Sequence, residues 1–344
     1  MTLEHKNSIF IKLGKFLAQF SEVENTKCQS VLHNDLYFDK FIDLIQLSPS
    51  HNGWYTNENV YFAIQSWAEA LTEDNLNQWL NRYNLDTISP KTVGLVLAGN
   101  IPLVGFHDLL STLIAGHTAV VKRSSKDQVL MDFIIASLIK INPAFEAQIL
   151  VQEQLKNCDA YIATGGNTAG NYFEYYFGKF PHIIRKNKTS IAILDGTETL
   201  AELAALADDC MLYYGMGCRN VTQIWVPEGY DFIPFLNALK KYNYLQDQHK
   251  YKHNYDYQLA LLMMRKQLYM DSGGVLMSEN PSPFAAISQI HYQQYPLGTS
   301  PTFNMDEIQC VVGKNQLPFG SLQKPLLAQY ADGVDSLAFL SSLK

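Results

Sequence analysis

The sequence predicts an α/β protein in which helices alternate with the strands of a parallel sheet, preceded by a helical N-terminal segment. Three observations predict it. About the first 90 residues carry apolar side chains at helical spacing, whereas short β-branched runs alternate with helical periods after Ser89-Pro90. The 344 residues are 47% hydrophobic and 17% charged, which is typical of a globular protein. At roughly 100–200 residues per domain, this length indicates two domains.

Two helices are predicted ahead of the sheet. The first carries Val60, Ile64, Trp67 and Leu71 on one face, and the second carries Leu76, Trp79, Leu80 and Tyr83. The elements of the sheet follow in order as a strand over 92–97, a helix over 106–114 ended by Gly116, a strand over 118–122, a helix over 130–141, and strands over 149–151 and 159–164. Strands that alternate with helices imply a parallel sheet, which binds ligands beyond the carboxyl ends of its strands.

A second unit is predicted to begin with a strand over 190–194. A long helix over 200–211 then runs into Cys218. We therefore expect one domain of residues 1–189, a second of residues 190–315, and a C-terminal segment of residues 316–344 that returns toward the first domain.

The charge balance bears on partners and location. The net charge is −7, from 26 basic and 33 acidic side chains, which disfavours nucleic acid and anionic membranes as partners. No apolar run reaches the roughly 20 residues that span a bilayer, and Glu4, Lys6, Lys12 and Lys15 interrupt the N-terminus. We expect a cytoplasmic protein with no membrane span.

The cysteines are odd in number and widely spaced. The sequence holds Cys28, Cys158, Cys210, Cys218 and Cys310, with no C-x-x-C pair. This pattern predicts neither a disulfide framework nor a zinc site. We expect most of these cysteines to be buried as small hydrophobic side chains and at most one to be a reactive thiolate.

Cys218 has a local setting that the other cysteines lack. It follows Gly215-Met216-Gly217 at a predicted helix-to-strand turn. The two glycines permit close backbone approach and could leave the thiol exposed with amide N–H groups nearby, as a nucleophile requires. The alternative is a buried structural cysteine beside a glycine turn.

Asn100 lies at the end of the first strand, in Ala98-Gly99-Asn100-Ile101-Pro102. Its amide could donate an N–H to an oxyanion, while Pro102 occupies the first helical turn. The alternative is an ordinary asparagine helix cap.

Two more turns are candidates for cofactor binding. Thr164-Gly165-Gly166-Asn167 joins a strand to a helix, so that backbone N–H groups and the positive helix end could face a pyrophosphate. The alternative is a plain turn, because the string is not the G-x-G-x-x-G fingerprint. Lys122, Arg123, Ser124 and Lys126 follow another strand and could hold an adenosine ribose or its phosphate; the alternative is a solvated turn.

Residues 240–257 interleave tyrosines with lysines and place His249 and His253 four residues apart. Nucleic-acid and metal sites are both conceivable here. The chain is acidic and offers no obvious third ligand, so we predict no metal and a solvated, tyrosine-rich helical face.

The order of these motifs resembles the aldehyde dehydrogenase superfamily, and within it most closely the LuxC-type acyl-CoA reductases. The resemblance covers about residues 90–340. The superfamily signals are Gly99-Asn100-Ile101-Pro102, Val120-Val121-Lys122, Ala163-Thr164-Gly165-Gly166, Gly215-Met216-Gly217-Cys218, Asp306-Glu307-Ile308 and Pro318-Phe319-Gly320. The LuxC-type strings are Leu97-Ala98-Gly99-Asn100-Ile101-Pro102, Ile184-Arg185-Lys186-Asn187 and Tyr330-Ala331-Asp332-Gly333-Val334-Asp335.

The resemblance implies a fold and a set of site residues. The fold is two-lobed, with a Rossmann-like cofactor domain in residues 1–189 and an α/β catalytic domain in 190–315. Cys218 would be the acylated nucleophile, and Asn100 with the Cys218 amide would bind the oxyanion. The cofactor would be bordered by Thr164, Gly165 and Gly166 at its pyrophosphate, by Lys122 at the adenosine ribose and by Glu307 at the nicotinamide ribose.

Three departures from the superfamily refine the prediction. Its aldehyde-oxidising members carry a glutamate base where this chain has Ile184-Arg185-Lys186-Asn187-Lys188, so a thiol such as coenzyme A becomes the expected acyl partner rather than water. Ser125 stands where NAD-preferring relatives often hold glutamate, and a neutral residue there favours NADPH over NADH. The chain is shorter than typical members, and Ser89-Pro90 leads straight into the first predicted strand where they carry a hairpin arm, so the oligomeric state does not carry over.

The resemblance thus predicts reduction of an acyl-CoA, a fatty acyl-CoA by the LuxC likeness, to an aldehyde by NADPH or NADH through a Cys218 thioester. The alternatives are an acyl-phosphate reductase, an aldehyde dehydrogenase of the same superfamily, and a non-catalytic subunit that binds a nucleotide or an acyl chain.

Overall fold

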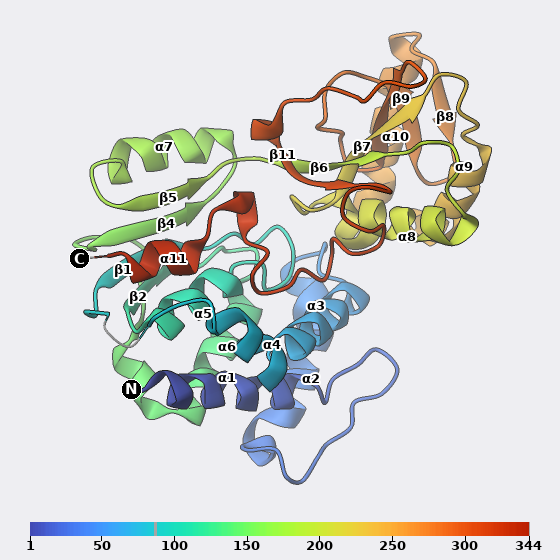
Figure 1. Ribbon diagram of the computed structural model, residues 1–344. Coiled ribbons are helices and arrows are strands. Elements are labelled where there is room, and N and C mark those ends of the chain that lie inside the picture. The colour runs from blue at the N-terminus through green and yellow to red at the C-terminus, as the bar shows by residue number, and fades with distance from the viewer. Residues whose placement is uncertain (86–87, 344) are drawn as a thin grey trace. The chain divides into compact units, whose positions relative to one another are not determined.

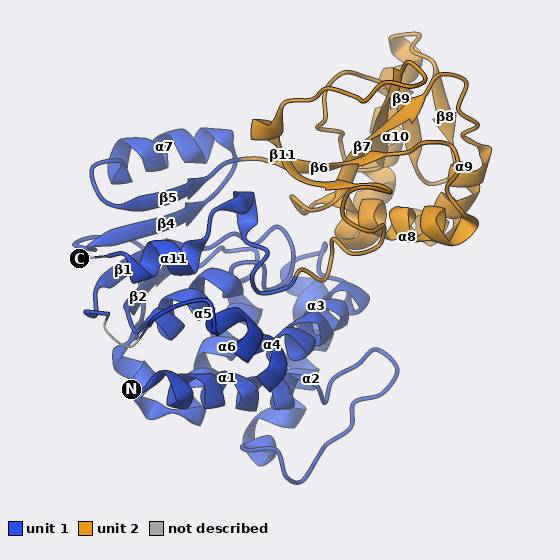
Figure 2. Ribbon diagram, viewed as in Figure 1, with its two compact units in different colours: residues 1–186, 326–344 blue, residues 187–325 orange. Residues whose placement is uncertain are grey.

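The computed structural model describes residues 1–85 and 88–343 (Figure 1). The chain forms two compact units, which Figure 2 colours separately. Unit 1 contains Met1–Lys186 and Leu326–Lys344, and unit 2 contains Asn187–Pro325.

The helical N-terminal segment belongs to unit 1. Three of its helices begin at a threonine whose side chain accepts a hydrogen bond from the amide three residues on, which satisfies one of the amides left unbonded by the first turn. Buried aromatic rings join the helices to the sheet domain, and the rings of Phe41 and Phe133 stack at 4.3 Å. The helices are α1 (Leu3–Leu17), α2 (Asn34–His51), α3 (Asn57–Ala70) and α4 (Glu73–Leu80).

Sheet A of unit 1 has five parallel strands in the order β3-β2-β1-β4-β5, so the predicted parallel sheet is confirmed. Its strands are β1 (Thr92–Val96), β2 (Thr118–Lys122), β3 (Ile149–Val151), β4 (Ala160–Thr164) and β5 (His182–Arg185), and its helices are α5 (Phe106–Ala115), α6 (Gln128–Ile141), η1 (Pro143–Ala147) and α7 (Asn167–Phe177). Gly116 ends α5 in the left-handed region, at φ 88°, as its predicted place requires. The chain turns to opposite sides of β1 to form β2 and β4, which makes their shared carboxyl edge a topological switch point.

Sheet B of unit 2 has six strands in the order β11-β6-β7-β10-β9-β8, and only β8 is antiparallel to its neighbour. Its strands are β6 (Thr189–Ile193), β7 (Val221–Pro227), β8 (Tyr269–Asp271), β9 (Leu276–Glu279), β10 (Gln289–Tyr295) and β11 (Ile308–Val312). The helices of the unit are α8 (Leu200–Met211), η2 (Leu212–Gly215), α9 (Ile233–Leu239), η3 (Lys240–Asp247), α10 (His249–Met264) and η4 (Met305–Glu307).

The C-terminal segment joins unit 1 ten residues later than the predicted return at 316. Residues 316–325 stay with unit 2 because the amides of Gly320 and Leu322 donate to Asp209, on α8. The predicted boundary at 189/190 likewise differs from the division after Lys186, because the strand that opens unit 2 already begins at Thr189.

Aromatic and polar contacts attach residues 326–343 to unit 1. The Trp79 indole donates to the Tyr330 hydroxyl at 2.6 Å, the two tyrosine hydroxyls of Tyr330 and Tyr83 lie 2.7 Å apart, and Tyr83 donates to Asp335 at 2.7 Å. Asp335 also caps α11 (Ser336–Ser341), which follows η5 (Ala331–Gly333). The Tyr330 string therefore docks this segment onto the helical layer.

The tyrosine-rich stretch departs from its predicted solvated face. Tyr242, Tyr251 and Tyr255 are buried, because the Tyr251 hydroxyl donates to the Gly274 carbonyl and the Tyr255 hydroxyl donates to Asp271. Among residues 1–85 and 88–343, no cluster of three His, Cys, Asp or Glu side chains is arranged to hold a metal ion. Over the same residues, no helix combines the length and apolar character needed to cross a membrane.

Candidate functional site

Asn220 builds the turn that carries Cys218. The side chain of Asn220 is fully buried; its oxygen accepts from the Gly217 amide at 2.8 Å, and its NH₂ group donates to the carbonyls of Asp209 and Leu212 at 3.0 and 2.8 Å. One side chain thus ties the turn to the end of α8. Sequence reasoning missed Asn220; the available signal was an asparagine two residues after the cysteine, at the start of a strand.

The approach to Cys218 is not the continuous helix that was predicted. Helix α8 ends at Met211, and Tyr213 and Tyr214 then take left-handed backbone conformations, at φ 54° and 60°. Gly215 follows at φ 74°, a conformation that costs glycine little. The chain therefore makes a tight irregular turn before the cysteine instead of extending the helix.

Cys218 itself is half-buried, at the amino end of β7. Its carbonyl accepts from the Ser190 hydroxyl at 3.1 Å, and the neighbouring Arg219 lies 3.3 Å from the Cys310 sulfur, which links the turn to β6 and β11. The alternative of a buried structural cysteine describes Cys158, Cys210 and Cys310. Burial raises the pKa of the Cys210 thiol well above its ordinary value.

Glu307 lies at the same edge of sheet B as Cys218. Residue 307 ends η4 immediately before β11, and Cys218 shortly precedes β7. Both strands run parallel to β6, which separates them in the sheet. Unit 2 therefore gathers two of the predicted site residues at the amino edge of its sheet.

The Asn100 turn lies at the carboxyl end of β1 in unit 1. The Tyr55 hydroxyl donates to the Gly99 carbonyl at 3.0 Å, and the Leu103 amide donates to Asp127 at 2.9 Å. The predicted placement of Pro102 in the first helical turn is wrong, because α5 begins at Phe106. Gly105 is the N-cap of α5, so the alternative of Asn100 as a helix cap does not describe this turn.

Lys122 and Ser124 lie next to the Asn100 turn. The Leu97 amide donates to the Lys122 carbonyl at 3.0 Å, and a Cβ on Gly99 would stand 2.5 Å from the Ser124 side chain. The Lys122 side chain is exposed, and Ser124 is half-buried. Glycine at position 99 lets the two turns pack against each other.

The Thr164-Gly165-Gly166 turn lies on the other side of the switch point. The Gly166 N-cap precedes α7, and its surroundings are open for 4 Å around a virtual Cβ. The Arg185 guanidinium contacts the Thr164 hydroxyl at 3.3 Å and the Asp108 carboxylate at 2.7 Å. The ends of β1, β2 and β4 therefore bring Asn100, Lys122, Ser124 and the Thr164 turn to one edge of sheet A.

Asp209 fixes the loop of the Pro318-Phe319-Gly320 string. It accepts from the Gly320 amide at 2.6 Å and from the Leu322 amide at 3.0 Å, while its backbone carbonyl accepts from Asn220. The same residue thus anchors both this loop and the Cys218 turn. Burial raises the pKa of Asp209 to about 6, although both hydrogen bonds lower it.

The raised pKa predicts a pH-dependent stability. Because the folded-state pKa lies above that of an exposed aspartate, ionisation opposes folding, and the free energy of unfolding falls as pH rises from about 4 to about 6, by roughly 3 kcal/mol. Asp209→Asn removes the ionisable group, so this fall should disappear. Measured by urea unfolding at pH 4.5 and pH 7, the free energy of unfolding of the variant should fall less, or rise more, toward pH 7 than that of the wild type. Equal differences in the two proteins would contradict the assignment.

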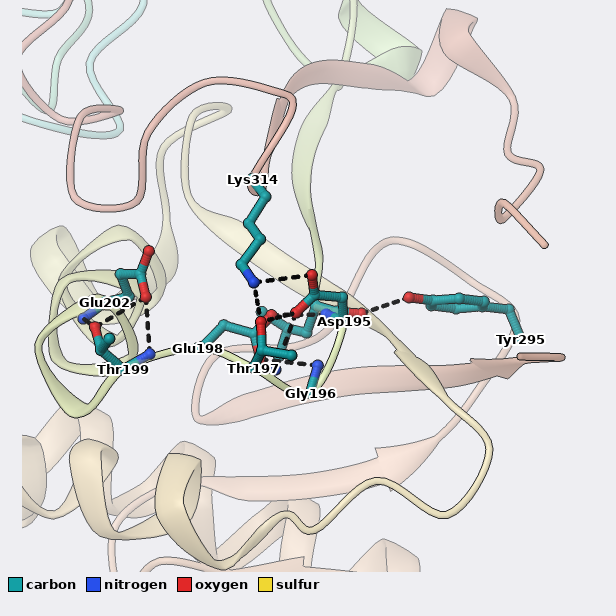
Figure 3. Close-up of polar contacts among 9 residues, drawn as sticks. Asp195, Gly196, Thr197, Glu198, Thr199, Glu202, Tyr295 and Lys314 are labelled. Carbon is teal, nitrogen blue, oxygen red and sulfur yellow. Dashed lines mark hydrogen bonds and ion pairs between the residues drawn. The ribbon is translucent and has the colours of Figure 1, made fainter. Parts of the chain in front are cut away.

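A second polar cluster occupies the opposite edge of sheet B (Figure 3). Glu198 accepts from the amides of Asp195 and Gly196 at 2.6 and 3.1 Å, and Lys314 pairs with Asp195 at 3.1 Å. Burial raises the pKa of Asp195, but the hydrogen bonds from Thr197 and Lys314 outweigh this effect and lower the pKa to about 2. The cluster follows β6, whereas Cys218 precedes β7, so it fixes loops away from the predicted site.

Sequence comparisons relate this chain to a known family of proteins. The sequence model of the LuxC family, described as acyl-CoA reductase, matches residues 67–239, half of the chain. A long-chain acyl-protein thioester reductase of Aliivibrio fischeri is 25% identical over 213 residues, and one of Photorhabdus laumondii is 24% identical over 146 residues. The matches cover 56% and 38% of this chain, but only 44% and 30% of those relatives' length.

Solved structures share the fold. A putative aldehyde dehydrogenase from Burkholderia cenocepacia has a TM-score of 0.62 at 11% identity, covering 86% of this chain and 70% of its own. A Mycobacterium tuberculosis aldehyde dehydrogenase in complex with NAD⁺ has a TM-score of 0.60 at 13% identity, covering 87% and 69%. The expected aldehyde-dehydrogenase-like α/β fold is confirmed, and the chain belongs to the LuxC family of acyl-CoA reductases.

Proposed function

We propose that this chain reduces an acyl thioester to an aldehyde with NAD(P)H, through a covalent thioester on Cys218. The observation that carries the proposal is the Cys218 turn: a half-buried thiol in a turn held by Asn220, in a chain that belongs to a family of acyl reductases. Fixed amides and a fixed sulfur are what an acyl-transfer nucleophile needs.

The proposed reaction has two steps, acyl transfer to Cys218 and reduction of the resulting thioester. The Cys218 thiolate attacks the carbonyl carbon, the bond to the donor sulfur breaks, and the donor leaves as a thiolate that takes up a proton from solvent. The Asn100 amide and the Cys218 N–H stabilise the oxyanion. A bound nicotinamide would then supply a hydride to the carbonyl carbon, after which the carbon–sulfur bond breaks and the aldehyde departs, returning Cys218 as thiolate.

The carboxyl edge of sheet A suits a nicotinamide cofactor. The open surroundings of Gly166 and the N-terminus of α7 leave room for a pyrophosphate, and exposed Lys122 stands where a ribose would lie in a doubly wound sheet. Ser125 is exposed and neutral, which favours NADPH because a 2′-phosphate would meet no carboxylate there. Several structural neighbours hold NAD⁺, so NADH is the alternative.

Coenzyme A is the proposed donor thiol, and an acyl-protein is the alternative. Residues 184–188 carry no carboxylate, and Arg185 is paired with Asp108, so this string offers no base to activate water. Both curated relatives are named for acyl-protein substrates, which favours a thioester on a carrier protein as the second candidate.

Intact-protein mass spectrometry tests the proposal. The protein is mixed without nicotinamide with acyl-CoAs from short to long chains, with acyl phosphates and with acylated carrier protein. We expect an acyl-sized mass gain from a CoA thioester, followed by aldehyde release when NADPH is added and slower release with NADH. A folded protein that gains no mass from any donor would contradict covalent catalysis.

Asn100→Ala should lower kcat for aldehyde formation by about 10²–10³-fold, because it removes one donor to the oxyanion. The affinity for NADPH, from fluorescence titration, should stay close to that of the wild type. Asn142→Ala is the control: its side chain accepts from the Ala144 amide at 3.1 Å and caps η1, which precedes β3 at the other edge of sheet A. Equal losses in the two variants would contradict the role of Asn100.

A further inference from the structure

We propose that Tyr55 and Asp127 are positioning residues that hold the Asn100 amide in its oxyanion-binding geometry. The inference rests on the proposed function and assigns a role to two residues that no motif of the sequence indicated. Neither side chain needs to touch the substrate. Both act through the backbone on either side of Asn100.

The two contacts bracket Asn100. The Tyr55 hydroxyl donates to the carbonyl of Gly99, one residue before it, and Asp127 accepts from the amide of Leu103, three residues after it. Both partners come from elsewhere in unit 1: Tyr55 precedes α3, and Asp127 begins α6. The turn is therefore held from two separate helices, and its own sequence does not determine its shape.

Asp127 is diverted from its ordinary role. An aspartate at the N-cap of a helix normally accepts from an amide of that helix, but Asp127 makes no such bond to α6. Its side chain is 3% exposed and reaches the Leu103 amide instead. A buried carboxyl that leaves its own helix uncapped indicates that the Asn100 turn is what it stabilises.

The turn needs this support because its backbone is strained. Leu103 lies at φ 55°, a left-handed conformation that is unfavourable for a leucine, and its side chain is fully buried. Gly99 leaves no room for a side chain, since a Cβ would stand 2.5 Å from Ser124 and 3.0 Å from the Asp127 Cβ. Without the bracket, the turn would relax and carry Asn100 with it.

The Asp127 carboxyl is buried beside the turn. Its Oδ2 accepts from the Leu103 amide at 2.9 Å, and this is the hydrogen bond by which Asp127 holds the turn. Burial raises the pKa of Asp127 well above its ordinary value, although the hydrogen bond from Leu103 lowers it. An amide oxygen at the same position could accept from Leu103 without burying a charge.

The test compares Tyr55→Phe with Tyr61→Phe. Both remove a hydroxyl from the helical segment, but the Tyr61 hydroxyl accepts from Asn25 and not from any group of the Asn100 turn in the hydrogen bonds of the described residues. Tyr55→Phe should lower the rate of Cys218 acylation by about tenfold or more, since small displacements of a catalytic group have such effects. NADPH affinity and melting temperature should match those of Tyr61→Phe.

A double-variant cycle separates positioning from general support of the fold. In an Asn100→Ala background, Tyr55→Phe should cause no further loss of rate, because the amide it positions is gone. Asp127→Asn should retain most of the activity, since an amide oxygen can still accept from the Leu103 N–H, whereas Asp127→Ala should lose activity as Tyr55→Phe does.

The outcomes are distinguishable. Two results would overturn the inference and leave the proposed function standing, provided that the wild type and Tyr61→Phe are acylated. In the first, Tyr55→Phe keeps the full rate of acylation. In the second, Tyr55→Phe lowers the rate by the same factor with and without Asn100. If Asp127→Asn is as impaired as Asp127→Ala, the hydrogen bond accepted from Leu103 is not what positions the turn, and the role of Asp127 is overturned. A wild type that accepts no acyl group overturns the proposed function, and this inference with it.

Discussion

Replacing Cys218 with alanine should abolish acyl transfer, lowering the rate of aldehyde formation by about 10³-fold or more. Removing the sulfur leaves no atom on which the acyl group can rest between its release from the donor thiol and its reduction. The mass gain seen with acyl-CoA in the absence of nicotinamide should disappear in the same variant. Because Cys218 is half-buried in a turn held by Asn220, the shorter side chain should leave the fold intact, which a thermal melt checks.

Cys28→Ser is the matched control for this experiment. Cys28 is the exposed cysteine, and its hydrogen bond with Ser30 lowers the pKa of its thiol, so it is the strongest competitor for nonspecific acylation. Cys28→Ser should keep both the specific mass gain and the reductase rate. A Cys218→Ala protein that still forms aldehyde, or a Cys28→Ser protein that no longer does, would contradict the assignment of the nucleophile.

Arg185→Met should produce the largest loss of stability, about 3–5 kcal/mol in the free energy of unfolding. The Arg185 and Asp108 side chains are only 5% and 8% exposed and lie 2.7 Å apart, so removing the guanidinium leaves a buried carboxylate without its charge partner. Arg185 also contacts Thr164, so the loss should extend to NADPH affinity. Urea unfolding and fluorescence titration measure the two effects.

The less buried pair of Arg123 and Asp132 provides the control. Its side chains are 18% and 41% exposed, and Arg123→Met should cost less than about 1 kcal/mol. In an Asp108→Leu background, Arg185→Met should recover much of the lost stability, because no buried charge then remains. Losses of equal size in Arg185→Met and Arg123→Met would show that burial of the first pair has no energetic consequence.

The sequence predicted four of the five strands of sheet A because their signals are local; the edge strand β5 was not predicted. Runs such as 118–122 and 149–151 are apolar, β-branched and bounded by turns, and the structure has β2 and β3 at those bounds. The candidate residues of each sheet edge could also be named, since parallel strands bring their turns together. Local periodicity and topology are enough for this part of the protein.

Contacts between distant segments were beyond the same reasoning. Arg185 stands in a basic string, and nothing near it in the sequence indicates its partner, a carboxylate 77 residues earlier in the chain that pairs with it in the interior. Tyr251 and Tyr255 were expected in solvent, but their hydroxyls find acceptors in 271–274. The roles of Asn220, Asp127 and Tyr55 depend equally on backbone groups that only the folded chain brings near.

Unit 1 is made of two separate stretches of the chain, and this affects the order in which the two units fold. Residues 187–325 are contiguous and leave the ribosome as one block, whereas unit 1 lacks residues 326–343 until all of unit 2 has been synthesised. Until then, the Trp79 indole and the surface of α5 have no Tyr330 and no α11 to cover them. Unit 2 can complete its fold as soon as residue 325 is synthesised, while unit 1 keeps an apolar face exposed until the segment that follows unit 2 has been added.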